Sequence, residues 1–132
     1  LPCAGLIYIE NKKLLLAKSS KKQCYYLPGG KVNNNETALQ ALCREILEEL
    51  NVVITENELE FYTHISAPAY GEKDDIVMEQ DCYFLKRTIT PKASAEIEEV
   101  NFFSSEEYQV ERYQAPGAIM VLLQLKKDNL IF

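Results

Sequence analysis

Three glutamates near the middle of the chain have the residue type and the spacing for metal chemistry. Glu45, Glu48 and Glu49 lie in a stretch, Glu36 to Leu50, whose apolar residues recur at helical spacing. At about 100° per residue, the three carboxylates share an arc of about 100° on one helix face. This arc borders the apolar stripe of the same helix. We therefore expect the carboxylates at the edge of the protein body and not on its solvated far side.

Carboxylates placed three and four residues apart repel each other by a few tenths of a kcal/mol in an isolated helix. A hard divalent cation such as Mg²⁺ offsets this repulsion, because it prefers oxygen ligands. Substrate phosphates often complete its coordination. A solvated acidic face is the alternative interpretation of Glu48 and Glu49 taken alone. Arg44 lies near Glu48 on the helical wheel, where we expect it to hold that carboxylate in place.

The rest of the chain must supply the elements that position this helix. Asn35 is a suitable N-cap and Asn51 tolerates the left-handed conformation that ends a helix. A mixed-sheet α/β layer fold is expected, as one domain over residues 1–132. The strands predicted are Cys3–Ile9 and Lys13–Lys18, paired as a hairpin, then Cys24–Leu27, Leu59–Ile65, Ile76–Lys86 and Val100–Phe103, with a turn over Pro68–Asp75 and a last helix over Gly117–Lys127 after Pro116.

Composition excludes several classes of protein. The 132 residues carry 14 Lys+Arg against 20 Asp+Glu, a net charge of −6, so binding of duplex nucleic acid on a basic face is not expected. No apolar run approaches the roughly 20 residues of a membrane span, and no secretory signal is present, so we expect a cytoplasmic protein that does not bind membranes. Structural zinc is disfavoured because the chain has one histidine and its four cysteines form no C-x-x-C pair. Reduced thiols are expected in a cytoplasmic protein at all four cysteines: Cys3, Cys24, Cys43 and Cys82.

Counted together with the residues before them, the glutamates resemble the signature of the Nudix hydrolase family, G-x5-E-x7-R-E-U-x-E-E-x-G-U, where U is aliphatic. Gly30 is followed after five residues by Glu36 and after seven more by Arg44, and the sequence from Glu45 to Val52 continues in register. Asn51 stands where the family has glycine. We expect this departure to cost little, since Asn is the next most tolerant residue in the left-handed conformation.

The resemblance implies a Nudix-like α/β/α sandwich with a mixed β-sheet, a catalytic loop-helix-loop and a C-terminal helix. It also implies Mg²⁺-dependent hydrolysis, with Mn²⁺ as an alternative ion, of a diphosphate bond in a nucleoside diphosphate linked to another group. The metal ligands it implies are Glu45, Glu48, Glu49 and the carbonyl of Gly30 or Gly29, with Glu49 the principal one. Glu45 and Glu48 would also be catalytic, Arg44 would orient a catalytic glutamate, and Glu36 would tie the loop to the helix.

Residues outside the signature are open to two interpretations each. Many family members carry a further glutamate, acting as a base or a ligand, before a late strand; Glu96 is our first candidate, ahead of Glu99, and Glu98 stays open. A solvated acidic loop is the alternative.

Lys31, Lys18 and Gly29 are expected to help bind an anionic substrate. Pro68 resembles a proline of ADP-ribose-hydrolysing relatives but is more typical of a turn. His64 is interpreted as a strand residue without a catalytic role, and the following are interpreted as core more than as base-stacking residues: Tyr25, Tyr26, Phe61 and Tyr70.

The substrate is the least determined property. The short chain favours a MutT-like nucleoside triphosphate hydrolase. An ADP-ribose or nucleotide-sugar pyrophosphatase and a non-catalytic nucleotide sensor are the alternatives, and a simple acidic interaction domain is a third. The chain keeps all three glutamates, which argues against a sensor. A small nucleotide is the expected partner, and the chain is expected to be a monomer or a homodimer.

Overall fold

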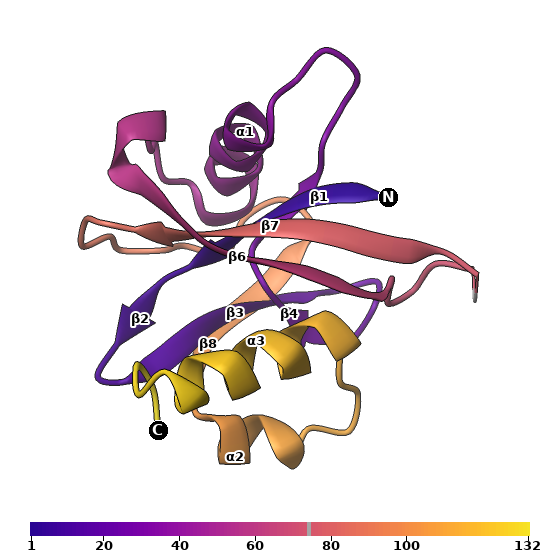
Figure 1. Cartoon of the computed structure of the whole chain (residues 1–132), viewed down its shortest axis with the longest axis vertical. Coiled ribbons are helices and arrows are strands. Elements are labelled where there is room, and N and C mark those ends of the chain that lie inside the picture. The colour runs from indigo at the N-terminus through magenta and orange to yellow at the C-terminus, as the bar shows by residue number, and fades with distance from the viewer. Residues whose placement is uncertain (74) are drawn as a thin grey trace.

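The computed structural model describes residues 1–73 and 75–132 and places two β-sheets between helices (Figure 1). One sheet has the strand order β5-β1-β7-β6; in the other, β3 lies between β2 and β4 and also pairs with β8. Helix α1 lies on one side of the sheets, and α2 and α3 lie on the other. The elements are β1 (Pro2–Ile7), β2 (Ile9–Glu10), β3 (Lys13–Ser19), β4 (Tyr25–Tyr26), β5 (Gly29–Lys31), α1 (Ala38–Leu50), η1 (Glu56–Glu58), β6 (Leu59–Pro68), β7 (Val77–Leu85), β8 (Ile97–Phe103), α2 (Ser105–Gln109) and α3 (Pro116–Lys127). The predicted α/β fold with a mixed sheet and a C-terminal helix is confirmed.

The first hairpin was predicted only in part. Asn11 and Lys12 have φ of 52° and 61°, as a two-residue turn of the type common in hairpins requires. Only Ile9–Glu10 returns along β3, however. The preceding strand, β1, pairs in parallel with β7 and antiparallel with β5 in the other sheet. The chain thus changes sheets near Tyr8, because its apolar residues are buried by partners that lie far away in the sequence.

The central strands are buried on both faces. Along β3, Leu15 belongs to the apolar cluster under α1, whereas its neighbours Leu14 and Leu16 belong to the cluster under α3. Leu6 and Ile7 of β1 divide in the same way between the two clusters. A strand with helices over both faces needs apolar residues at consecutive positions, which explains why these segments read as continuous apolar runs.

Helix α1 begins later than predicted. Its N-cap is Thr37, whose hydroxyl accepts a hydrogen bond from the Gln40 amide at 3.1 Å while the Gln40 side chain accepts one from the Thr37 amide at 2.9 Å. This reciprocal capping box outcompetes Asn35, which instead takes a left-handed turn conformation with φ of 65°. The predicted helix end is confirmed, since Asn51 has φ of 56° and its amide bonds to the Leu47 carbonyl.

Other boundaries also moved. Strands β6 and β8 are longer than predicted, and the strand predicted over Cys24–Leu27 is reduced to two residues. Helix α2 and strand β5 were not predicted: both are short, and β5 contains two glycines. The turn predicted over Pro68–Asp75 includes Asp74, which lies outside the described residues. All four cysteines are free thiols, as predicted.

Among the described residues, no helix is long and apolar enough to cross a membrane. The single domain over residues 1–132 stays a prediction.

Candidate functional site

A cavity of about 480 Å³ lies between the mixed sheet, the start of α3 and one edge of α1. Of the three glutamates on α1, Glu45 and Glu49 line this cavity, whereas Glu48 is exposed and does not. On a helical wheel all three glutamates share one arc. Glu49 is the one nearest the apolar stripe and is buried in the structure, and Glu48 lies at the opposite end of the arc.

Glu49 is the most deeply buried charged side chain of the described residues, at 2% exposure. Its carboxylate accepts a hydrogen bond of 2.9 Å from the backbone amide of Gly29. Burial raises the pKa of Glu49 to about 8, against the opposing effect of the Gly29 amide; the charges of Glu45 and Glu96 raise it further. Such a carboxyl favours a proton or a cation over an uncompensated charge.

Arg44 connects α1 to the loop before it. Its guanidinium donates at 2.9 Å to the Glu36 carboxylate, at 2.6 Å to Glu45 and at 3.0 Å to the Lys31 carbonyl. Hydrogen bonds from the Arg44 guanidinium and from the Asn33 amide to the Glu36 carboxylate lower the pKa of Glu36 to about 2. The predicted Arg44–Glu48 pair is wrong: because the helix starts at Ala38, Glu36 stays in the loop within reach of the guanidinium.

The pKa of Glu45 shifts in the opposite direction from that of Glu36, although both carboxylates bind Arg44. Burial raises the pKa of Glu45 more than the Arg44 charge and hydrogen bond lower it, and the charges of Glu48 and Glu96 add to the increase. The end of the cavity next to α1 is therefore acidic: it is lined by Glu45, Glu49 and Glu96, and, besides burial, the charges of these carboxylates raise the pKa values of Glu45 and Glu49. We call it the acidic end.

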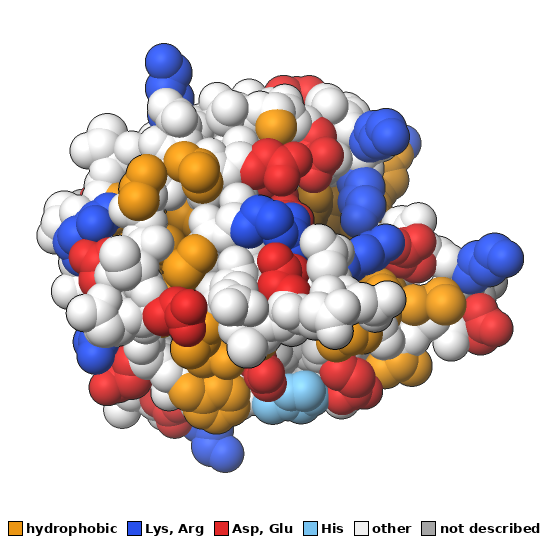
Figure 2. Space-filling model, turned by 90° about the horizontal axis from the view of Figure 1, so that it is seen from above, with side chains coloured by type: hydrophobic (Ala, Val, Ile, Leu, Met, Phe, Trp, Pro, Cys, Tyr) orange, Lys and Arg blue, Asp and Glu red, His pale blue; other side chains and the backbone are white. Residues whose placement is uncertain are grey.

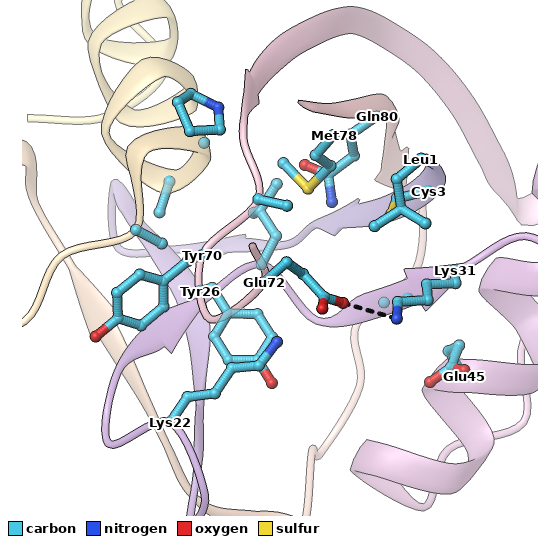
Figure 3. A pocket seen from close by; sticks show the side chains of 18 of the residues that line it. Leu1, Cys3, Lys22, Tyr26, Lys31, Glu45, Tyr70, Glu72, Met78 and Gln80 are labelled. Atoms are coloured by element: carbon cyan, nitrogen blue, oxygen red, sulfur yellow. Dashed lines mark ion pairs between the residues drawn. The ribbon is translucent and has the colours of Figure 1, made fainter. Parts of the chain in front are cut away.

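Both lysines predicted to bind substrate, Lys31 and Lys18, have acidic partners. Lys31 Nζ lies 2.7 Å from Glu72 Oε1, beside the cavity it lines, and Figure 3 shows this ion pair with Glu45 and Gln80 on opposite sides of it. Lys18 is not among the lining residues; it lies 3.8 Å from Glu98 and over the Tyr25 ring. Lys22, which the sequence analysis did not single out, does line the cavity.

The late acidic loop separates into three different environments. Glu96 lines the cavity, and its carbonyl accepts a hydrogen bond from the Ser20 amide at 3.1 Å. The Glu99 carboxylate accepts a hydrogen bond from the Tyr25 hydroxyl, and Glu98 pairs with Lys18. Of the three glutamates, Glu96 lines the cavity, and the role of each stays a prediction.

The end of the cavity away from α1 is mainly apolar, and the sequence analysis missed most of it. Alternation along β7 places Met78, Gln80 and Cys82 on the face toward α3, and this period of two was the available signal. Gly29, Gly30 and Pro68, all considered from sequence, line the cavity. It is also lined by Leu1, Cys3, Tyr26, Leu27, Asn33, Ala69, Tyr70, Ala115, Gly117 and Ala118.

Three side chains weighed in the sequence analysis lie elsewhere. Tyr25 is buried against Phe103, and Phe61 packs edge-on against Tyr83. The single histidine, His64, is exposed on the β6–β7 face with Asp81 at 2.7 Å and Glu79 at 2.8 Å. Figure 2 shows it in pale blue with acidic side chains on either side.

The acidic end fits a divalent cation by the chemistry of its donors. Carboxylate oxygens of Glu45, Glu49 and Glu96 and the backbone of Gly29 and Gly30 are hard oxygen ligands around one cavity. Within residues 1–73 and 75–132, no three acidic, histidine or cysteine side chains lie close enough to hold an ion on their own. Such a site needs water and a bound ligand to complete the coordination, as Mg²⁺ sites commonly do.

Comparison with known proteins identifies one family. The family model of the NUDIX domain matches residues 2–123. Among solved structures, a MutT NUDIX hydrolase from Burkholderia pseudomallei is 20% identical, with 94% of this chain and 96% of that chain covered and a TM-score of 0.76. A Caenorhabditis elegans Ap4A hydrolase is 21% identical, with 96% and 95% covered and a TM-score of 0.67.

A third structure comes from a larger protein. It is a bifunctional NMN adenylyltransferase/ADP ribose pyrophosphatase from Francisella tularensis, in complex with AMP and a manganese ion, and is 17% identical with a TM-score of 0.69. The alignment covers 96% of this chain and 41% of that one. No curated protein sequence matches. The three proteins are named for different activities, so the likeness identifies a fold and not a substrate.

Proposed function

Since the chain belongs to the Nudix hydrolase family, a family of pyrophosphohydrolases, we propose that it cleaves a diphosphate bond of a nucleoside triphosphate in a Mg²⁺-dependent reaction. The observation that carries this proposal is the pairing, in one cavity, of a buried acidic end with an apolar end. A substrate with a phosphate chain at one end and a flat ring at the other matches both.

Each residue of the acidic end has a role in this proposal. Glu49, Glu45 and a backbone carbonyl of Gly29 or Gly30 would hold the cation, with exposed Glu48 as an outer ligand. When bound, such a cation supplies positive charge to the diphosphate and acidifies water. Arg44 would keep Glu45 in place, and Glu96 would accept a proton from the attacking water. Lys31 and Lys22, which line the cavity, would bind phosphate oxygens.

Identifying the products of a substrate panel at alkaline pH with Mg²⁺ tests the proposal. A nucleoside monophosphate plus pyrophosphate from a triphosphate is the expected result. The alternative is an ADP-linked substrate, which is favoured by the position of Pro68 in the cavity wall and yields AMP plus a phosphorylated partner. Tight binding of nucleotides without turnover of any of them would overturn the proposal in favour of a sensor.

Comparison of Glu96→Gln with Glu99→Gln tests the proposed base. We expect the Glu96 substitution to lower kcat by about a hundredfold or more, because general-base catalysis contributes about a hundredfold to ten-thousandfold. The Glu99 substitution should have the smaller effect, since an amide oxygen still accepts the Tyr25 hydrogen bond. Steady-state rates at saturating Mg²⁺ measure both. Equal rates for Glu96→Gln and the wild type would remove Glu96 from the mechanism.

Replacing Arg44 by Lys tests positioning of Glu45. A lysine keeps the charge but has no planar fork, so it cannot bind Glu36, Glu45 and the Lys31 carbonyl together. We expect kcat to fall by about tenfold with a smaller change in KM, an effect typical of a lost supporting contact. Arg87→Lys, at an exposed arginine that pairs with Glu58, is the matched control and should leave kcat unchanged.

The oligomeric state, the absence of nucleic acid and membrane partners, and the location in the cell stay predictions.

A further inference from the structure

Gln80 is a polar side chain in an otherwise apolar part of the cavity wall. It lies on β7, between β1 and β6, and is 6% exposed. Met78 and Cys3 lie near it in the wall (Figure 3), and Leu27 lines the same cavity. A buried amide surrounded by apolar groups costs free energy unless its donors and acceptors are satisfied, so the position of Gln80 requires an explanation.

The side-chain oxygen of Gln80 has a hydrogen-bond partner, whereas its amide nitrogen has none among residues 1–73 and 75–132. Oε1 accepts a hydrogen bond from the Cys82 thiol at 3.7 Å. Nε2 bonds to no described residue, yet no fully buried side-chain nitrogen or oxygen among those residues lacks a partner. Nε2 is therefore not sealed in the core. It reaches the cavity, where its N–H groups are free to bind a ligand.

The backbone of β1 confines this amide. Gly5 faces Gln80, and a methyl group on Gly5 would lie 2.8 Å from Nε2 and 3.0 Å from Cδ. Any side chain at Gly5 would therefore displace the amide. The amide is thus confined between the Cys82 thiol, which contacts Oε1, and the bare strand at Gly5, which lies next to Nε2, in the wall of the cavity.

The distance between Gln80 and the acidic end suits a nucleotide. Gly29, which donates to Glu49, lies opposite Gly5 on the next strand, and Gln80 lies on the strand beyond β1. Two strand spacings separate β5 from β7, about 10 Å. The rings of Tyr26 and Tyr70 also line this cavity, and aromatic faces of this kind favour a planar ring.

We propose that Gln80 recognises the base of the nucleotide. Its amide donates a hydrogen bond to a carbonyl oxygen on the ring, and it disfavours bases that carry an amino group at that position. This inference rests on the proposed function for the nature of the substrate. It goes beyond that function by naming the residue and the ring chemistry that select among triphosphates. An amino group offers a donor to a donor, which leaves both groups unsatisfied in a desolvated cavity.

The test compares substrates that differ in this group. Inosine triphosphate and ATP have a carbonyl and an amino group at the same ring position, and UTP and CTP form a second such pair. We expect the wild-type kcat/KM to favour the carbonyl member of at least one pair by about tenfold or more, as one unsatisfied hydrogen bond implies. In Gln80→Met, which keeps the length of the side chain without its donor, the ratio should approach one.

Gln80→Glu provides a second and sharper variant. It keeps the shape of the side chain and replaces the donor by an acceptor, so the preference should reverse toward the amino member of the pair. Gln109→Met, at an exposed position on α2, is the matched control and should keep the wild-type ratio. Thermal unfolding of all variants separates a change in the ratio from loss of the fold.

The outcomes separate this inference from the proposed function. If triphosphates are hydrolysed but the ratio is the same in wild type and Gln80→Met, the role of Gln80 is overturned and the proposed function stands. If no triphosphate is hydrolysed, the proposed function fails, and the same ratio is then measured from the binding affinities for inosine triphosphate and ATP by calorimetry. A wild-type preference that Gln80→Met abolishes supports the inference, and equal preferences contradict it.

Discussion

Replacing Glu49 by Gln should lower kcat by roughly a hundredfold or more and, at alkaline pH, make the metal-free protein more stable. The loss of rate follows from removing the most buried carboxylate of the proposed cation site, a change of the same order as losing a principal charge-stabilising group. The gain in stability follows from burial, because the wild type must keep an ionised carboxyl at 2% exposure. Gln keeps the oxygen that accepts the Gly29 hydrogen bond.

The pH dependence of stability has a definite sign. The pKa of Glu49 is about 8 in the folded protein and about 4.3 in an unfolded chain. Its contribution to stability is therefore fully present below pH 4.3 and is lost as the pH rises to about 8. The lost contribution to the free energy of unfolding is on the order of a few kcal/mol. The unfolding free energies of Glu49→Gln and wild type should be similar at about pH 4 and diverge, in favour of the variant, as the pH rises to about 8.

Mg²⁺ should remove this difference. A cation that binds only the folded protein stabilises it by mass action, and it competes with the proton on Glu49. The increase in the melting temperature on adding Mg²⁺ should therefore be larger at pH 8.5 than at pH 6 for wild type and small for Glu49→Gln. Glu60→Gln removes the same charge at an exposed position of β6 and should behave as wild type. A Mg²⁺ effect that is independent of pH would contradict the assignment.

Gly29→Ala should have the largest effect on folding. Gly29 has φ of +141°, and a methyl group there would lie 2.0 Å from the carbonyl oxygen of Ala4. That oxygen belongs to the backbone of the neighbouring strand β1, so relief of the clash requires separation of β5 from β1. We expect a loss of about 3 kcal/mol or more, or about 10 °C in melting temperature, measured by denaturation.

Gly71→Ala is the matched control, since it also introduces a side chain at a positive φ, +82°. Its nearest contact is the flexible end of Lys22, at 3.0 Å, which moves aside easily. The expected cost is about 1 kcal/mol, that of the backbone conformation alone. Similar losses for the two variants would show that the contact with β1 does not decide the cost. Because Gly29 also donates to Glu49, a folded Gly29→Ala protein should show weakened Mg²⁺ binding as well.

Local patterns were sufficient where a single element carried the information. The helix with its acidic edge follows from the spacing of Leu42, Ile46 and Leu50, and its end follows from the tolerance of Asn51 for a positive φ. The first residue of the helix was missed because two caps compete over three residues, and a reciprocal hydrogen-bond pair at Thr37 is stronger than one at Asn35. That shift in turn decided which carboxylates Arg44 binds.

The sequence by itself determined the type of protein: an α/β fold, a helix with carboxylates along one edge and the residues that hold it. These properties depend on periodicity and on contacts within a few turns of one helix. Only the tertiary structure decided how the three glutamates differ, with Glu49 buried and Glu48 exposed, and which lysines lie at the cavity. It also brought together Gly5 of β1 and Gln80 of the neighbouring strand β7, because strand pairing joins residues that no local pattern relates.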